Sequence, residues 1–106
     1  MEVLIKPKVY AAMKEFYIAS IRLHETLDEA TCMKKMQRLE DAMLRFSHYA
    51  EIFHKRPFRY DWNANGWYDF CTEDFHFAYT VNILPDARKV LVYHDAVHSL
   101  LNHNCH

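Results

Sequence analysis

The spacing of apolar residues changes at Pro57, and this change constrains the fold more than any other feature of the sequence. Between Cys32 and Phe53, apolar side chains recur every three or four residues, which is the spacing of one helix face. After Pro57, apolar and polar residues alternate in short runs, as in strands with one buried face. Because a proline ring cannot continue a helix, we expect a helical part followed by a strand-rich part.

The helical part predicts one strand and two helices. Residues 2–6 form an apolar run that is too short for a helix and ends at Pro7. An apolar stripe from Val9 to Leu27 predicts the first helix, and Asp28 is suited to cap the second. The second stripe contains Cys32, Met36, Leu39, Met43, Phe46, Ala50 and Phe53. A short link between such helices predicts an antiparallel helical hairpin.

The strand-rich part predicts an antiparallel meander. Its strands are expected at residues 58–62, 67–72, 75–83 and 89–93. The Asn65-Gly66 pair tolerates the positive φ of a tight turn, so the first two runs are expected to form a hairpin. The end of the chain, at 96–102, is expected to be a short helix or turn. The predicted class is therefore α+β, in the order β-α-α-β-β-β(-β) with three or four strands after the helices, and with an antiparallel curved sheet and the helical hairpin on one face.

Composition bounds the size of the domain and the class of partner. The 106 residues are 51% hydrophobic, which predicts one packed domain over 1–106. A net charge of −1 with eight neutral histidines gives no general attraction to phosphate, so a nucleic acid would need a local basic patch. The three cysteines lack CxxC spacing, which suits a reducing cytoplasm. No apolar stretch approaches the ~20 residues that cross a bilayer, so no membrane contact is expected.

The run from Tyr68 to Val81 raises the question of which way His76 points. Successive strand residues face opposite sides of a sheet. If Phe75, Phe77 and Tyr79 pack beneath the helices, His76 lies on the open face. We therefore expect His76 there, near Asp69 or Cys71 of the neighbouring strand.

The segments GWYDFCTEDFHFAYTV and KVLVYHDAVHSLL, together with the order of elements, resemble the RelE/ParE superfamily of bacterial toxins, also known as plasmid stabilisation proteins. Residues 75–79 resemble a family strand of the form aromatic-Arg-apolar-apolar-Tyr, with His76 at the arginine position. Residues 92–95 resemble the family's last strand, which ends in a histidine or basic cluster. Trp67 and Asp69 stand where the ribonucleases of the family carry paired lysines, and Leu101 stands at the terminal tyrosine.

The resemblance implies a cytoplasmic toxin with a cognate antitoxin, and two modes of action. The first is a metal-independent endoribonuclease that cuts messenger RNA on the ribosome. In that mode, general acid–base groups would come from five residues, which are His76, His94, Asp95, Asp69 and His98. The second is a non-catalytic protein, either a ParE-like inhibitor of DNA gyrase or a degenerate, non-toxic member of the fold. A third hypothesis is a structural domain that dimerises through an aromatic sheet face.

Two further groups are candidates for contacts rather than for catalysis. Lys55, Arg56 and Arg59 form a basic group that could hold phosphate or an acidic antitoxin, and the alternative is a solvated helix end. The tail His103-Asn104-Cys105-His106 contains ligands for zinc or nickel, although a frayed terminus is the simpler interpretation. His94 and His98 are four residues apart, a spacing that could place two imidazoles on one helical face for a metal, but no third ligand at a defined spacing accompanies them. We therefore expect no metal and no cofactor.

Overall fold

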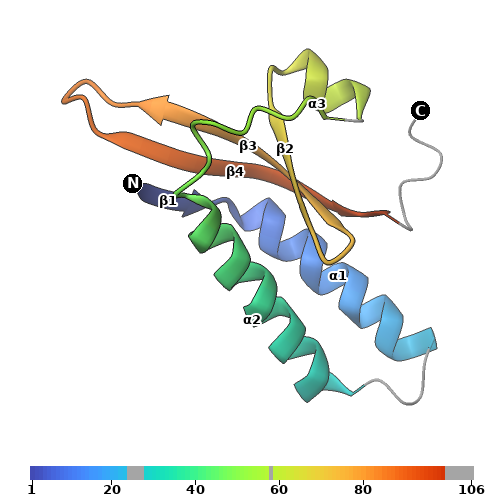
Figure 1. Ribbon diagram of the computed structural model, residues 1–106. Helices are drawn as coiled ribbons and strands as arrows, with labels where there is room; N and C mark the ends of the chain where they lie inside the picture. The colour runs from blue at the N-terminus through green and yellow to red at the C-terminus, as the bar shows by residue number, and fades with distance from the viewer. Residues whose placement is uncertain (24–27, 58, 100–106) are drawn as a thin grey trace.

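The computed structural model describes residues 1–23, 28–57 and 59–99, and has an α+β architecture. Figure 1 shows helices α1 and α2 side by side and antiparallel on one face of the sheet, with the short helix α3 on the opposite side. The bounds of the helices are Pro7–Leu23 for α1, Glu29–Phe46 for α2 and Tyr60–Ala64 for α3. The strands are β1 at Glu2–Ile5, β2 at Tyr68–Thr72, β3 at Phe75–Ile83 and β4 at Lys89–His98.

The sheet is mixed rather than antiparallel. Its strand order is β1-β4-β3-β2, and β1 pairs in parallel with β4 while the other pairs are antiparallel. The backbone crosses directly from β1 into α1, because the Lys6 N–H donates to the Tyr93 carbonyl and Pro7 opens the helix. The prediction of a wholly antiparallel sheet was wrong because it considered only neighbouring strands, whereas β1 pairs with the last strand.

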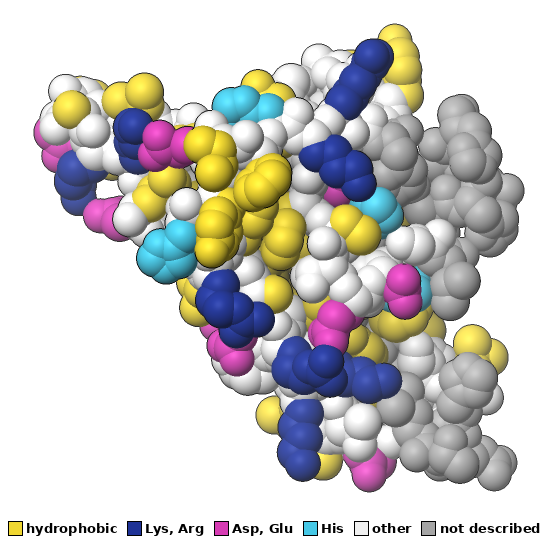
Figure 2. Space-filling view, in the orientation of Figure 1, with side chains coloured by type: hydrophobic (Ala, Val, Ile, Leu, Met, Phe, Trp, Pro, Cys, Tyr) yellow, Lys and Arg dark blue, Asp and Glu magenta, His cyan; other side chains and the backbone are white. Residues whose placement is uncertain are grey.

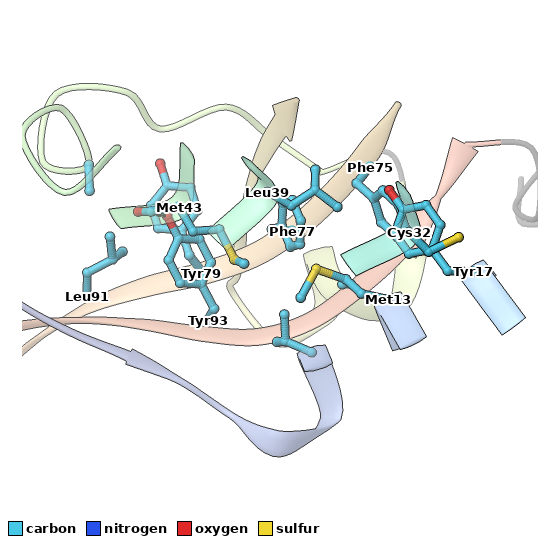
Figure 3. Close-up of a cluster of buried hydrophobic side chains, with 13 residues drawn as sticks. Met13, Tyr17, Cys32, Leu39, Met43, Phe75, Phe77, Tyr79, Leu91 and Tyr93 are labelled. Carbon is cyan, nitrogen blue, oxygen red and sulfur yellow. Dashed lines mark hydrogen bonds between the residues drawn. The ribbon is translucent and has the colours of Figure 1, made fainter. Parts of the chain in front are cut away.

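Both long helices place one stripe of side chains against the sheet. Helix α1 buries Val9, Met13 and Tyr17, and α2 buries Cys32, Leu39 and Met43. The predicted cap of α2 is confirmed, since the Asp28 carboxylate accepts the Thr31 N–H at 2.7 Å. Figure 3 shows the buried side chains that it labels on the two helices, from Met13 to Met43, meeting Phe75, Phe77, Tyr79, Leu91 and Tyr93 of the sheet. The predicted helical hairpin on one face is therefore confirmed.

Two tyrosine hydroxyls join the sheet to the chain above it. The Tyr93 hydroxyl donates to the Met43 carbonyl at 2.8 Å, and burial raises the Tyr93 pKa. The Tyr79 hydroxyl donates to the Phe53 carbonyl, and burial raises its pKa to about 12. Both hydroxyls thus remain protonated donors at neutral pH.

Four predictions about individual elements were wrong. Helix α2 ends at Phe46 instead of continuing to Phe53, because turns over 47–52 keep Ala50 buried without a helix. The strand predicted at 58–62 is absent from the described residues there, where α3 begins at Tyr60. Strand β4 continues to His98, so the described part of the predicted 96–102 turn is mostly strand. Gly66 has the expected positive φ of 72°, but it follows α3 rather than joining two strands.

Candidate functional site

A carboxylate, an imidazole and a thiol lie together on the sheet face away from α1 and α2. Strand pairing places Cys71 opposite His76 and Asp69 opposite Ala78. The His76 Nδ1 atom lies 3.0 and 3.1 Å from the two Asp69 carboxylate oxygens. The His76 Nε2 atom lies 3.9 Å from the Cys71 Sγ atom. The expected position of His76, on the open face beside Asp69 and Cys71, is therefore confirmed.

A tight turn sets this register. Strands β2 and β3 are joined by Glu73 and Asp74, whose φ angles of 48° and 67° are those of a type I′ hairpin. Such a turn matches the strand twist and fixes the pairing, so Phe75, Phe77 and Tyr79 face the helices. The Asp74 carbonyl also accepts the Ser99 N–H and hydroxyl, both at 2.8 Å, which ties the turn to the end of β4.

Asp69 is a buried carboxyl, with 4% of the residue exposed. Burial raises its pKa, and the His76 imidazole and the Lys55 charge oppose the rise. Both Asp69 carboxylate oxygens lie within hydrogen-bond distance of His76 Nδ1, so the carboxylate accepts the Nδ1–H of the neutral imidazole. This tautomer leaves the lone pair of Nε2 on the side of Cys71, as a general base requires.

Cys71 is an exposed thiol that was not among the predicted site residues. Burial of the sulfur and the Asp69 charge raise its pKa, so the group is a thiol rather than a thiolate at neutral pH. The signal that would have found it is the I′ turn, because Cys71 and His76 lie symmetrically on its two sides.

A β-bulge brings two consecutive residues of β4 to the same open face. Ala78 pairs with Asp95 and Tyr79 pairs with Tyr93, which leaves His94 as the extra residue. The His94 ring stacks on Trp67 with centroids 4.7 Å apart, and its Nε2 lies 2.7 Å from the Thr80 hydroxyl oxygen. Its Nδ1 atom is buried without a hydrogen-bond partner among the described residues, and burial lowers the pKa of the imidazole. His94 is thus a neutral, tightly packed ring.

Asp95 holds elements together. The Trp62 Nε1–H of α3 donates to its Oδ2 at 3.0 Å, the Ala96 N–H donates to its Oδ1 at 2.8 Å, and the Lys8 ammonium is 3.5 Å away. Trp62 is fully buried and was not predicted as a functional residue. These contacts engage both carboxylate oxygens, so Asp95 anchors α3 over the open face.

His98 lies on the opposite side of the sheet from His76 and His94. Its ring stacks on Phe16 of α1 with centroids 3.9 Å apart, and burial lowers its pKa. The idea that His94 and His98 share a helical face was wrong, because both belong to β4 and face opposite sides. The structure brings His76 and Asp69 together and leaves His98 in the core.

The predicted basic residues divide into two kinds. Lys55 and Arg56 are exposed, and the Lys55 carbonyl accepts the Asp69 N–H at 3.0 Å along the edge of β2. Arg59 instead bonds both Asp61 oxygens, at 2.9 and 3.1 Å, and its guanidinium lies 5.5 Å from the centre of the Trp62 ring. Lys55 is therefore the cation whose charge reaches the Asp69 and Cys71 groups.

Within residues 1–23, 28–57 and 59–99, no group of three or more His, Cys, Asp or Glu side chains has a geometry suited to a metal ion. No helix in this part of the chain combines the length and apolar character of a membrane span. The tail His103-Asn104-Cys105-His106 and Leu101 lie outside the described residues.

The chain matches no family model, no curated protein and no solved structure. The RelE/ParE relationship therefore stays a prediction from the resemblance of residues and from the order of elements.

Proposed function

We propose that this protein is a RelE/ParE-like toxin that cleaves RNA without a metal ion, with His76 as the general base. The observation that carries the proposal is the Asp69–His76 pair on the open face, with Nδ1 of His76 held at 3.0 Å by a buried carboxylate. Because Asp69 accepts the Nδ1–H, the Nε2 lone pair is left on the side of Cys71, where it can take a proton from a substrate hydroxyl.

The proposed RNA cleavage uses His76, Asp69 and Lys55. Nε2 of His76 takes the proton of a ribose 2′-hydroxyl, and the 2′-oxygen forms a bond to phosphorus. The bond from phosphorus to the 5′-oxygen breaks, and the leaving oxygen takes a proton from solvent. Asp69 stabilises the imidazolium that forms, and the Lys55 ammonium beside the pair offsets phosphate charge. In this assignment, His94 and Asp95 shape the site and do not transfer protons.

An exposed apolar surface favours a second candidate, the non-catalytic toxin. Tyr49, Ile52 and Phe53, after α2, are 53%, 73% and 57% exposed. Figure 2 shows hydrophobic side chains gathered on this side of the molecule, with basic and histidine side chains around them. A ParE-like inhibitor would act through such a surface alone, and in either mode an antitoxin would cover it.

Expression without an antitoxin separates the candidates. We expect the unchanged chain to arrest bacterial growth, and the purified protein to cleave RNA in the presence of a chelator. His76→Ala should lower the cleavage rate by about 10²-fold or more. His48→Ala, at an exposed histidine of the turn after α2, should leave the rate unchanged. Growth arrest that persists in His76→Ala without RNA cleavage would establish the binding mode instead.

A further inference from the structure

The Cys71 thiol has no role in the RNA chemistry above, yet it completes an ordered set of three groups. Starting beside the β2–β3 turn, Cys71 Sγ of β2 faces His76 Nε2 of β3 at 3.9 Å, and His76 Nδ1 faces Asp69 of β2 at 3.0 Å. We propose that Cys71 is a nucleophile for acyl transfer, with His76 as its general base and Asp69 as the residue that positions the imidazole. The substrate class is a small activated ester or thioester. This activity shares His76 with RNA cleavage but does not depend on RNA being a substrate.

The order of the three groups is the one that nucleophilic catalysis requires. A nucleophile must reach one ring nitrogen of the base, and an acceptor must hold the other in the correct tautomer. Strand pairing enforces this order, because Cys71 and His76 are directly cross-strand and Asp69 is two residues along β2 on the same face. The buried carboxylate fixes the ring, while Cys71 is an exposed residue.

The state of the thiol makes the base necessary. Burial and the Asp69 charge raise the Cys71 pKa, so a preformed thiolate is not the reactive species. Nucleophilic attack at neutral pH therefore requires transfer of the Sγ proton to Nε2 as the new bond forms. Asp69 stabilises the resulting imidazolium, which couples the three groups in one step.

The backbone supplies a donor for the developing oxyanion. Strand β2 is the last strand on its side of the sheet, and its Asp69 N–H points outward to the Lys55 carbonyl. Since peptide groups alternate in direction along a strand, the Cys71 N–H points toward the same outer edge. The nucleophile's own N–H can then bind the carbonyl oxygen as it becomes negative, with the Lys55 charge nearby.

The reaction balances without a further reagent. Sγ forms a bond to the carbonyl carbon while its proton moves to Nε2 of His76. The tetrahedral intermediate then expels the alcohol or thiol, which takes that proton from Nε2, and a thioester remains on Cys71. In the second half, water gives a proton to Nε2 as its oxygen attacks the thioester carbon. The carboxylic acid leaves, and the proton returns from Nε2 to Sγ.

The test uses p-nitrophenyl acetate and the full chain with Cys105→Ser in every sample, so that acylation of the C-terminal cysteine is removed. Cys32 is buried and serves as an internal control. We expect one acetyl group per chain, located on Cys71 by peptide mass spectrometry after an acid quench. Cys71→Ala and Cys71→Ser should abolish this thioester. His76→Gln should slow its formation by about 10²-fold, and Asp69→Asn by about 10-fold.

Two comparisons make the result decisive. The rate per thiol should exceed that of N-acetylcysteine at the same pH, although the Cys71 pKa is raised. The proposal would be overturned if the rate equals that of N-acetylcysteine or does not change in His76→Gln. Acetylation found only on lysines would also overturn it. Cys71→Ala should retain RNA cleavage, so loss of acylation in that variant is separate from failure of the ribonuclease. Circular dichroism of each variant checks that the fold is intact.

Discussion

Asp69 combines a structural cost with a chemical role. Its carboxyl is buried, and burial places its folded-state pKa above that of the unfolded chain. The protonated form is then favoured by folding, and this stabilisation is lost as pH rises through the folded-state pKa. Above that pKa the ionised Asp69 therefore opposes folding, and its presence is explained by the orientation that it gives to His76.

Asp69→Asn separates the two effects. The neutral amide can accept the Nδ1–H bond but cannot stabilise an imidazolium. We expect a free energy of unfolding at pH 7 that equals or exceeds that of the unchanged chain, measured by urea denaturation. The RNA cleavage rate should fall by about 10²-fold. A clear loss of stability would instead identify Asp69 as a structural carboxylate.

Helix α3 depends on one indole for its position. Trp62 is fully buried, and its Nε1–H donates to the Asp95 carboxylate. Trp62→Phe keeps most of the apolar contact but removes one donor from a buried carboxylate. We expect a loss of about 1–3 kcal/mol in the free energy of unfolding. Trp67→Phe is the control, since within residues 59–99 no hydrogen bond joins the Trp67 side chain to α3, and the ring can still stack on His94. Equal losses in the two variants would show that ring size, not the bond to Asp95, sets the stability.

The β3–β4 connection contains a residue in a conformation that favours glycine. Ala87 has a φ of 67° and is the last residue of a turn that its N–H closes by donating to the Leu84 carbonyl. We expect Ala87→Gly to raise the free energy of unfolding by about 0.5–1 kcal/mol, because it relieves the strain of an L-residue with positive φ. The same substitution at Ala11, on the exposed side of α1, should lower stability by about 1 kcal/mol. If both variants were destabilised, chain entropy would outweigh the strain at Ala87.

At the level of elements, local pattern predicted the helices and the central strand but failed where distant contacts decide. The alternation in β3 placed His76 on the correct face because a single apolar side was enough to fix it. In β4 the extra His94 interrupts the alternation, which is why residues 96–98 were not expected to be strand. Residues 60–64 are rich in strand-forming aromatics, yet burial of Trp62 against β4 selects a helical turn. The pairing of β1 with β4 links the two ends of the chain, and no short-range signal encodes it.

For the candidate site, residue types were more predictable than their roles. Alternation and turn chemistry are sufficient to bring Asp69, Cys71 and His76 to one place. What the sequence does not reveal is which polar groups become engaged by the core. Asp95 is bound by α3, His94 by Trp67 and Thr80, and His98 by Phe16. Each of these contacts joins residues from elements that are far apart in sequence or are irregular.

The molecule as a whole should lose stability in mild acid. Burial lowers the pKa of both His94 and His98, so their folded-state pKa values lie below that of an unfolded histidine. As pH falls below about 6.5, the unfolded chain binds protons first, and the stability contributed by neutral His94 and His98 decreases. We expect the free energy of unfolding to fall between pH 7.5 and 5.5.

Matched substitutions test the source of this slope. His94→Gln and His98→Gln should each flatten the dependence on pH, because glutamine does not titrate. His48→Gln, at an exposed histidine, should leave the slope unchanged. The Lys6 charge also lowers the His94 pKa, so Lys6→Gln should likewise flatten the dependence of stability on pH. If His94→Gln, His98→Gln and Lys6→Gln all leave the slope unchanged, the acid sensitivity comes from other groups.

The bulge in β4 also determines how this chain tolerates changes in length. Loss of one residue from a regular strand normally inverts every side chain beyond it. Loss of residue 94 would not invert the side chains beyond it. Tyr93 faces inward and Asp95 faces outward, so the two would alternate normally once the extra residue between them is removed. A lineage that dropped the codon for His94 would restore an unbroken pleat and leave the rest of the inner layer as it is.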